Sequence, residues 1–345
     1  MTQDLSALPI LDLGLLDSTP EDAARFRAQL AQATHEIGFF YLVNTSLPPS
    51  LEKRMHDAAR AFFALPLEDK LAIANTNSAQ FRGYTALGLE RTRGQVDLRE
   101  QIDICPEGVA FSEEELRGRE KFWRLVGPNQ WPAALPELRQ VSEEWQAHCE
   151  RISRKLLRAW ALALGESEDY FERSFGDPFT LLKIVRYPPT SPSADSDGVQ
   201  GVGKHKDAGV LTLLWIDGSG GLQVEKGGKW VDVPPVRNGF VVNIGEMLEY
   251  ATQGYLKATS HRVTLNEGTG DRISVPYFFN PALDAKLPLI QIPKELGGEY
   301  KVSEDPENPI FSLYGENCLK SRLRSHPDVA ERHHRDLVGL PPLTT

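Results

Sequence analysis

The chain has 345 residues, 41% hydrophobic and 25% charged, which is the composition of a globular protein large enough to bury a substantial core. Its formal net charge of −10 argues against a nucleic-acid partner, because the phosphate backbone would repel most of such a surface. No stretch approaches about 18 consecutive apolar residues, and the first residues lack a signal-peptide pattern. We therefore expect a cytoplasmic protein with no membrane partner. The three cysteines fall in no ligand or disulfide spacing and are expected to be reduced thiols.

The first 64 residues predict helices around short strands. Residues 9–13 form an apolar opening strand, and Thr19 followed by Pro20 is a helix start signal, since threonine can cap and proline fits the first helical position. Residues 38–43 are aromatic and β-branched behind a glycine and predict a buried strand. Residues 51–64 predict a second helix.

Two further segments precede the second half of the chain. Residues 80–105 are strand-like and polar, and we expect surface hairpins, with the mouth of a cleft as the alternative. Residues 136–164 carry an apolar stripe at helical spacing, stopped by Gly165, and predict a long scaffold helix that covers a sheet.

After residue 179 the pattern changes to short strands separated by Gly, Pro and Asp, at intervals typical of a sandwich or barrel. The predicted strands are 180–187, 208–216, 221–225, 229–233, 239–244, 259–265 and 272–279. The Pro-, Ser-, Asp- and Gly-rich segment 188–203 is expected to be a mobile loop, either a lid or an insertion without a role.

Three residues have the spacing of a metal site. His205 and Asp207 are two positions apart, and alternate residues of a strand project from the same face. His261, from a distant predicted strand, would add a second imidazole. Two nitrogens and one oxygen with an open face suit a non-haem Fe(II) that must also hold a cosubstrate and O2.

A possible anion site follows in the strand that begins at Arg272. Alternation places Arg272 and Ser274 on one face, and a guanidinium on an interior face requires an anionic partner, such as a carboxylate. Tyr187, at the end of an earlier strand, offers another polar contact. Lys183 would share the face of Tyr187. We expect it to be solvated, with a further anion partner as the alternative.

Four segments contain these candidates: His205-Lys206-Asp207, His261-Arg262-Val263, Arg272-Ile273-Ser274 and Tyr187-Pro188-Pro189. With the segments GLQV, VNIG and PYFFNP and the N-terminal PILDL and EIGFFYLVN, they closely resemble the isopenicillin N synthase-like branch of the Fe(II)/2-oxoglutarate-dependent oxygenases. The resemblance covers most of the chain.

The resemblance implies a mainly β, α+β fold: a double-stranded β-helix (jelly-roll, cupin-like) core flanked by helices, with a helical N-terminal region. The expected organisation is a leader region at 1–110, scaffold helices at 111–178, the catalytic core at 179–300 and a C-terminal helical segment at 301–345, together forming one compact unit.

The same resemblance implies Fe(II) on His205, Asp207 and His261. It also implies 2-oxoglutarate with its distal carboxylate on Arg272, Ser274 and Tyr187. O2 would be the oxidant and ascorbate a candidate reductant. The enzyme would hydroxylate or desaturate a C–H bond of a small molecule and release succinate and CO2.

Two departures from the family pattern concern the cosubstrate and the chemistry. Val185 stands where many plant members have an asparagine two residues before the tyrosine, and Glu246 stands where an aspartate commonly follows the Val-Asn-Ile-Gly segment. We expect no change of chemistry from Glu246. An arginine–serine pair also occurs in relatives that use no 2-oxoglutarate, so an oxidase or oxidative cyclase remains an alternative, as does a non-catalytic sensor.

The sequence indicates candidate residues for the substrate pocket and leaves the oligomeric state undetermined. The wall of a jelly-roll pocket would draw on the hairpins before residue 105, the loop before His205 and the C-terminal helix. The candidate lining residues are Phe81, Arg82, Tyr84, Arg99, Phe279, Phe311 and Tyr314. Arginine and aromatic residues there favour a small carboxylate or amino-acid-like substrate. The adjacent His333 and His334 are expected on a solvated helix face.

Overall fold

The computed structural model describes residues 8–189, 200–265, 270–293, 296, 300–302, 305–306 and 308–341. Most of the segment predicted as a lid or insertion, 190–199, lies outside the described residues.

An eight-stranded sheet forms the larger wall of the core, with the strand order β1-β2-β12-β9-β14-β7-β6-β3. Its neighbouring strands are antiparallel apart from the pair β1 and β2, which is parallel. The strands are β1 (Ile10–Asp12), β2 (Phe39–Val43), β3 (Gly83–Thr85), β6 (Glu100–Ile104), β7 (Leu181–Tyr187), β9 (Leu211–Ile216), β12 (Phe240–Ile244) and β14 (Arg272–Phe279).

A four-stranded antiparallel sheet with the order β11-β10-β13-β8 forms the other wall. Its strands are β8 (Val202–His205), β10 (Leu222–Lys226), β11 (Lys229–Asp232) and β13 (His261–Val263). A separate hairpin consists of β4 (Arg91–Thr92) and β5 (Gln95–Val96). The two sheets enclose a cavity lined from both sides, which confirms the predicted jelly-roll core flanked by helices.

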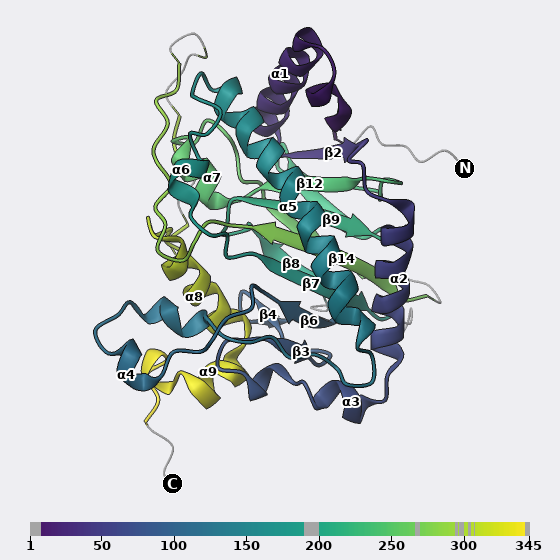
Figure 1. Ribbon diagram of the computed structural model, residues 1–345, viewed down its shortest axis with the longest axis vertical. Helices are drawn as coiled ribbons and strands as arrows, with labels where there is room; N and C mark the ends of the chain where they lie inside the picture. Colours follow the sequence, from purple (N-terminus) through teal and green to yellow (C-terminus); the bar gives the residue numbers. More distant parts are fainter. Residues whose placement is uncertain are drawn as a thin grey trace.

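Helices cover the outer face of the large sheet (Figure 1). The long helix α5 (Glu137–Ala163) runs obliquely across this face and contacts α1 (Pro20–Glu36), α2 (Pro49–Ala64), β9 and β14. The other α-helices are α3 (Leu67–Leu71), α4 (Glu113–Leu116), α6 (Glu172–Phe175), α7 (Glu246–Ala251), α8 (Tyr314–Ser325) and α9 (Pro327–His333). Short 3-10 helices are η1 (Leu13–Asp17), η2 (Asn75–Asn77), η3 (Lys121–Leu125) and η5 (Arg335–Leu337).

Local sequence signals explain how the N-terminal part joins the core. The side chain of Thr19 accepts a hydrogen bond from the Asp22 amide, and Pro20 opens α1, as the sequence predicts. Strand β2 pairs with β12, so the first 43 residues contribute strands to the same sheet as the catalytic core.

The prediction of simple surface hairpins for residues 80–105 is wrong for most of that segment. Strands β3 and β6 extend the large sheet beyond β7, and every residue of β6 is buried. The acidic residues of β6 are tolerated inside because they form ion pairs, for example between Glu100 and Lys70 at 3.0 Å. Among the described strands, the β4–β5 hairpin alone lies apart from the two main sheets.

The expectation of a solvated histidine pair is also wrong. His334 is 1% exposed, stacks on Phe81 with ring centroids 5.1 Å apart, and contacts the Ala79 carbonyl through Nε2 at 2.7 Å. His333 contacts the Thr76 carbonyl. The three cysteines are free thiols, as expected. Among the described residues, no helix is both long and apolar enough to cross a membrane.

Replacement of Trp145 tests how much the packing of α5 against the sheet contributes to stability. The Trp145 side chain is fully buried and makes edge contacts with Trp215 and Phe240, at centroid distances of 6.1 and 5.9 Å. We expect Trp145→Ala to lower the free energy of unfolding by about 3–5 kcal/mol, because the cavity left behind cannot fully collapse. Urea titration would measure this loss. Leu162→Ala, on the same helix but 41% exposed, is the matched control and should change stability by about 0.5 kcal/mol or less.

Candidate functional site

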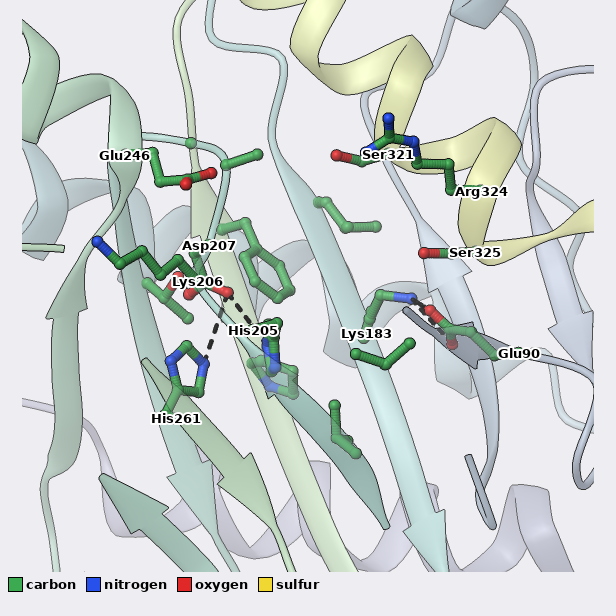
Figure 2. A pocket seen from close by; sticks show the side chains of 18 of the residues that line it. Glu90, Lys183, His205, Lys206, Asp207, Glu246, His261, Ser321, Arg324 and Ser325 are labelled. Atoms are coloured by element: carbon green, nitrogen blue, oxygen red, sulfur yellow. Dashed lines mark hydrogen bonds and ion pairs between the residues drawn. The ribbon is translucent and has the colours of Figure 1, made fainter. Parts of the chain in front are cut away.

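The structure brings His205, Asp207 and His261 together, with one possible ligand atom from each within 4.8 Å of the others. His205 ends β8 and His261 begins β13, and these two positions are direct antiparallel partners. Both Nε2 atoms lie 3.6 Å from Oδ1 of Asp207 (Figure 2). Asp207 lies two residues beyond the end of β8, so the expectation that both residues alternate along one strand is wrong for the aspartate.

Backbone carbonyls orient the two imidazoles. Nδ1 of His205 lies 2.8 Å from the Gly203 carbonyl, and Nδ1 of His261 lies 3.2 Å from the Thr259 carbonyl. A carbonyl can only accept, so each Nδ1 carries the proton and donates it. This leaves the lone pair of each Nε2 directed toward Asp207, which is the arrangement that a metal ion requires.

Two donors that the sequence reasoning missed hold the carboxylate of Asp207. The Thr212 hydroxyl donates to Oδ2 at 2.6 Å, and the Asn243 amide donates to the same oxygen at 2.8 Å. Oδ1 therefore faces the histidines. Thr212 and Asn243 are buried polar residues in the otherwise apolar strands β9 and β12, and that contrast is the signal that could have identified them.

Burial and mutual charge set the protonation of these groups. Burial, reinforced by the charge of His261, lowers the pKa of His205 to about 4. Burial opposes ionisation of Asp207, but His261, His205 and the two donors together lower the pKa of that carboxyl. Neutral imidazoles beside an ionised carboxylate are the protonation states in which these side chains bind metal.

A buried arginine without a hydrogen-bond partner lies in the same cavity, as a candidate anion site. Arg272 is 3% exposed, and none of its three guanidinium nitrogens has a hydrogen-bond partner among the described residues. Its guanidinium carbon lies 4.6 Å from the centre of the Tyr187 ring. Tyr187 on β7 is the cross-strand partner of Arg272 on β14. Ser274 is buried two residues further along β14 and lines the cavity with both. A buried, unpaired guanidinium is unfavourable unless an anion binds it.

The donor set fits the cofactor and the cosubstrate that the sequence implies. Two imidazole nitrogens and one carboxylate oxygen on one side of an open cavity are the ligands of a facial non-haem Fe(II) site. The unpartnered fork of Arg272 fits the carboxylate of an oxo acid, which can accept two parallel hydrogen bonds.

The cavity has a volume of about 850 Å³, enough for a cosubstrate and a small substrate. Of the candidate pocket residues, Arg99 and Tyr314 line it. The other five candidates do not line it. Phe81 stacks on His334, Arg82 donates to the Leu125 carbonyl, Tyr84 donates to Glu100, Phe279 stacks on Phe175, and Phe311 is 39% exposed beside Lys320.

A buried ionic cluster forms the wall opposite the histidines. Lys183 lies 3.2 Å from Glu90 and 2.9 Å from Asp103, so the expectation of a solvated lysine is wrong (Figure 2). Arg99 contacts Glu90 at 3.1 Å, and Arg322 of α8 pairs with Asp103. Burial opposes ionisation of Glu90, but Arg99 and Lys183 lower the pKa of Glu90 to about 2. The cluster places both signs of charge along the cavity.

Comparison with known proteins identifies the family. Residues 179–281 match the 2OG-Fe(II) oxygenase superfamily, and residues 8–134 match the family described as non-haem dioxygenase in morphine synthesis N-terminal. The chain belongs to the isopenicillin N synthase-like 2OG-Fe(II) oxygenases and is a non-haem dioxygenase that uses Fe(II) and 2-oxoglutarate.

Individual relatives cover nearly the whole chain. It is 37% identical to homoarginine-6-hydroxylase 2-ODD-C23 of Glycine max, over 95% of this chain and 100% of that protein. It is 34% identical to the 2-oxoglutarate-dependent dioxygenase frbJ of Dothideomycetidae sp., over 94% of this chain and 91% of that protein. The protein in the crystal structure of JOX2 in complex with 2OG, Fe and JA is 25% identical in sequence. The two structures align with a TM-score of 0.69 over 94% of this chain and 88% of that chain. These relatives do not favour an oxidase without 2-oxoglutarate or a non-catalytic sensor.

His326 gives the protein an acid-sensitive element outside the metal triad. It is 1% exposed in the cavity wall, and burial lowers the pKa of His326 to about 4. The unfolded chain binds the proton at an ordinary pKa of about 6.5, so stability falls as the pH drops from 7 toward 4. We expect a loss from this group of about 2 kcal/mol between about pH 7 and 5. Urea unfolding at both pH values should show a smaller loss in His326→Gln; an equal loss in both proteins would contradict the assignment.

Proposed function

We propose that His205, Asp207 and His261 bind the Fe(II), and that Arg272 binds the distal carboxylate of 2-oxoglutarate, in an enzyme that hydroxylates a C–H bond of a small amino-acid-like substrate. The observation that carries the residue assignment is the guanidinium of Arg272, which has no hydrogen-bond partner among the described residues and is buried in the cavity that also contains the triad. Ser274 and Tyr187 lie beside it and would complete the carboxylate site.

In this proposal, Fe(II) with 2-oxoglutarate and O2 supplies the oxidation, with succinate and CO2 as products. The protein supplies geometry and a dry site. Thr212 and Asn243 keep one oxygen of Asp207 directed at the histidines. The Phe39 ring packs edge-on against His261 at 5.2 Å, and Leu214, Leu222 and Val263 contribute apolar lining that limits access of water.

Two observations support an amino-acid-like substrate. Charged side chains of both signs line the cavity, which suits a small polar molecule rather than a hydrocarbon. A relative that matches this chain over almost its full length is named a homoarginine-6-hydroxylase. Hydroxylation, rather than desaturation or cyclisation, is the reaction that this name describes.

A substrate screen tests the function. Purified protein with Fe(II) and 2-oxoglutarate is incubated in air with L-homoarginine, L-arginine, L-lysine and their N-acetyl derivatives, and succinate is quantified. We expect at least one free amino acid to raise succinate release well above the rate without substrate, and omission of Fe(II) to abolish it. Mass spectrometry should show the substrate gaining one oxygen atom. Failure to bind 2-oxoglutarate at all would refute the proposed function.

Arg272→Lys tests the cosubstrate assignment. Lysine keeps the charge but loses the planar fork, so we expect the dissociation constant for 2-oxoglutarate to rise by about tenfold or more. Calorimetric titration without O2 measures it directly. The matched control is Arg262→Lys. Arg262 stacks on Trp230 at 4.3 Å, bonds to Gln223 and does not line the cavity, so this change should leave 2-oxoglutarate affinity unaltered. Equal affinity in parent and Arg272→Lys would remove Arg272 from its role.

A further inference from the structure

Glu246 is a buried carboxylate in the cavity to which the family chemistry gives no role. It is the first residue of α7, directly after β12, and is 4% exposed. Its backbone N–H donates to the carbonyl of Asp207 at 2.7 Å, so it lies next to a proposed iron ligand. Figure 2 shows its carboxylate directed into the cavity, on the same side as the triad and facing α8.

Buried carboxylates on the opposite wall of the cavity and elsewhere on α7 are paired with cations. Glu90 and Asp103 share Lys183, and Glu249, three residues after Glu246 on α7, lies 3.4 Å from Lys206. The hydrogen bond that Glu246 accepts comes from the neutral amide of Asn308, at 3.3 Å. Among the described residues, no cation lies within 4.0 Å of its carboxylate. The charges of Lys206 and Lys320 act on Glu246 from a greater distance and offset its burial only in part. Glu246 is therefore a buried acid that has no direct ion pair among the described residues.

This is the counterpart of the situation at Arg272. A buried guanidinium without a partner indicates an anionic ligand, and a buried carboxylate without a cation indicates a cationic one. Because the two residues differ in sign, they would not compete for the same group. The dianionic cosubstrate would be drawn to Arg272 and repelled by Glu246.

We propose that Glu246 binds a cationic group of the primary substrate, a guanidinium or a primary ammonium, and thereby determines substrate specificity. The inference rests on the proposed function and names the chemistry that its substrate must carry. A carboxylate can accept two parallel hydrogen bonds from a guanidinium, and such charge-assisted pairs are stronger than neutral ones. A cation held at Glu246 would place its neighbouring carbon atoms on the side of the cavity that carries the triad.

A purely structural role would have different consequences. A carboxylate in the first turn of a helix is stabilised by the helix dipole, and Glu246 occupies such a position. Glu249 lies in the same turn and shares that benefit, yet it does not line the cavity. If Glu246 only stabilised α7, its neutralisation would lower stability without changing which ligands bind.

The test compares two ligands of nearly equal shape. L-Arginine carries a charged guanidinium, and L-citrulline carries a neutral urea in its place. Each is titrated by calorimetry, without O2, into protein loaded with Fe(II) and 2-oxoglutarate; the one-carbon-longer homologues of both are tested in the same way. For at least one pair, we expect the parent protein to bind the guanidino compound about tenfold more tightly or better. Glu246→Gln keeps the side-chain shape and should bring that ratio close to one.

Glu249→Gln is the matched control, because it neutralises an equally buried carboxylate on the same helix outside the cavity lining. It should retain the preference of the parent. The parent, Glu246→Gln and Glu249→Gln should bind 2-oxoglutarate with similar affinity. This measurement tests the proposed function separately from the inference about Glu246. The inference is overturned if the parent shows no preference within either pair or binds none of the four compounds. It is also overturned if Glu246→Gln weakens both members of a pair equally, or if Glu249→Gln removes the preference as well.

Discussion

The carboxylate of Asp207 is the group on which the arrangement of the site depends. Its Oδ2 accepts hydrogen bonds from β9 and β12 of the large sheet, through Thr212 and Asn243. Its Oδ1 faces histidines carried by β8 and β13 of the small sheet. One side chain thus connects the two walls of the jelly roll. Because the two oxygens face different sheets, a shift of one sheet against the other would remove contacts that orient the Asp207 carboxylate.

Charge compensation divides the cavity into two parts. At the wall formed by β7 and α8, Glu90, Asp103, Lys183 and their neighbours neutralise one another, so this region is preorganised and needs no ligand to be stable. Nearer the triad, Arg272 has no hydrogen-bond partner among the described residues, and Glu246 is buried with only the more distant charges of Lys206 and Lys320 to offset it. Since an uncompensated ion is unfavourable in a dry interior, each marks a place where a ligand completes the structure. A 2-oxoglutarate-dependent reaction brings two organic ligands, the cosubstrate and the primary substrate, into one cavity.

Features governed by local periodicity could be predicted from the sequence. The alternation of β14 places Arg272, Ser274, Pro276 and Phe278 along the cavity, because a strand has only two faces and one of them is interior. The long helix α5 followed from its apolar stripe, and the start of α1 from its cap. The fold itself followed from the set of motifs rather than from any single segment.

Features governed by contacts between distant segments could not be predicted. Lys183 is buried because Glu90 and Asp103, some 80 to 93 positions earlier, supply its counter-charges. His334 is buried because it meets a carbonyl 255 positions away. Polarity suggested that Tyr84 and Arg82 would face a pocket, yet each reaches a partner away from it. The sequence around a polar residue carries no information about such distant partners. Exposure to solvent was therefore the expected environment, and that expectation was wrong.

The metal site and Glu246 are joined through the backbone, and glycine makes this possible. The start of α7 packs directly against the segment that contains Asp207. The Gly245 N–H donates to the Val210 carbonyl at 2.8 Å, and the Glu246 N–H donates to the Asp207 carbonyl at 2.7 Å. A Cβ on Gly245 would lie 2.2 Å from the Gly209 carbonyl oxygen and 2.8 Å from that of Asp207, so no other residue fits without displacing one of them. The Val-Asn-Ile-Gly-Glu segment therefore acts on Asp207 twice, through the Asn243 side chain and through the backbone. Any ligand held by the Glu246 carboxylate is positioned by the same contacts that position the aspartate, which ties the location of the substrate to that of the iron site.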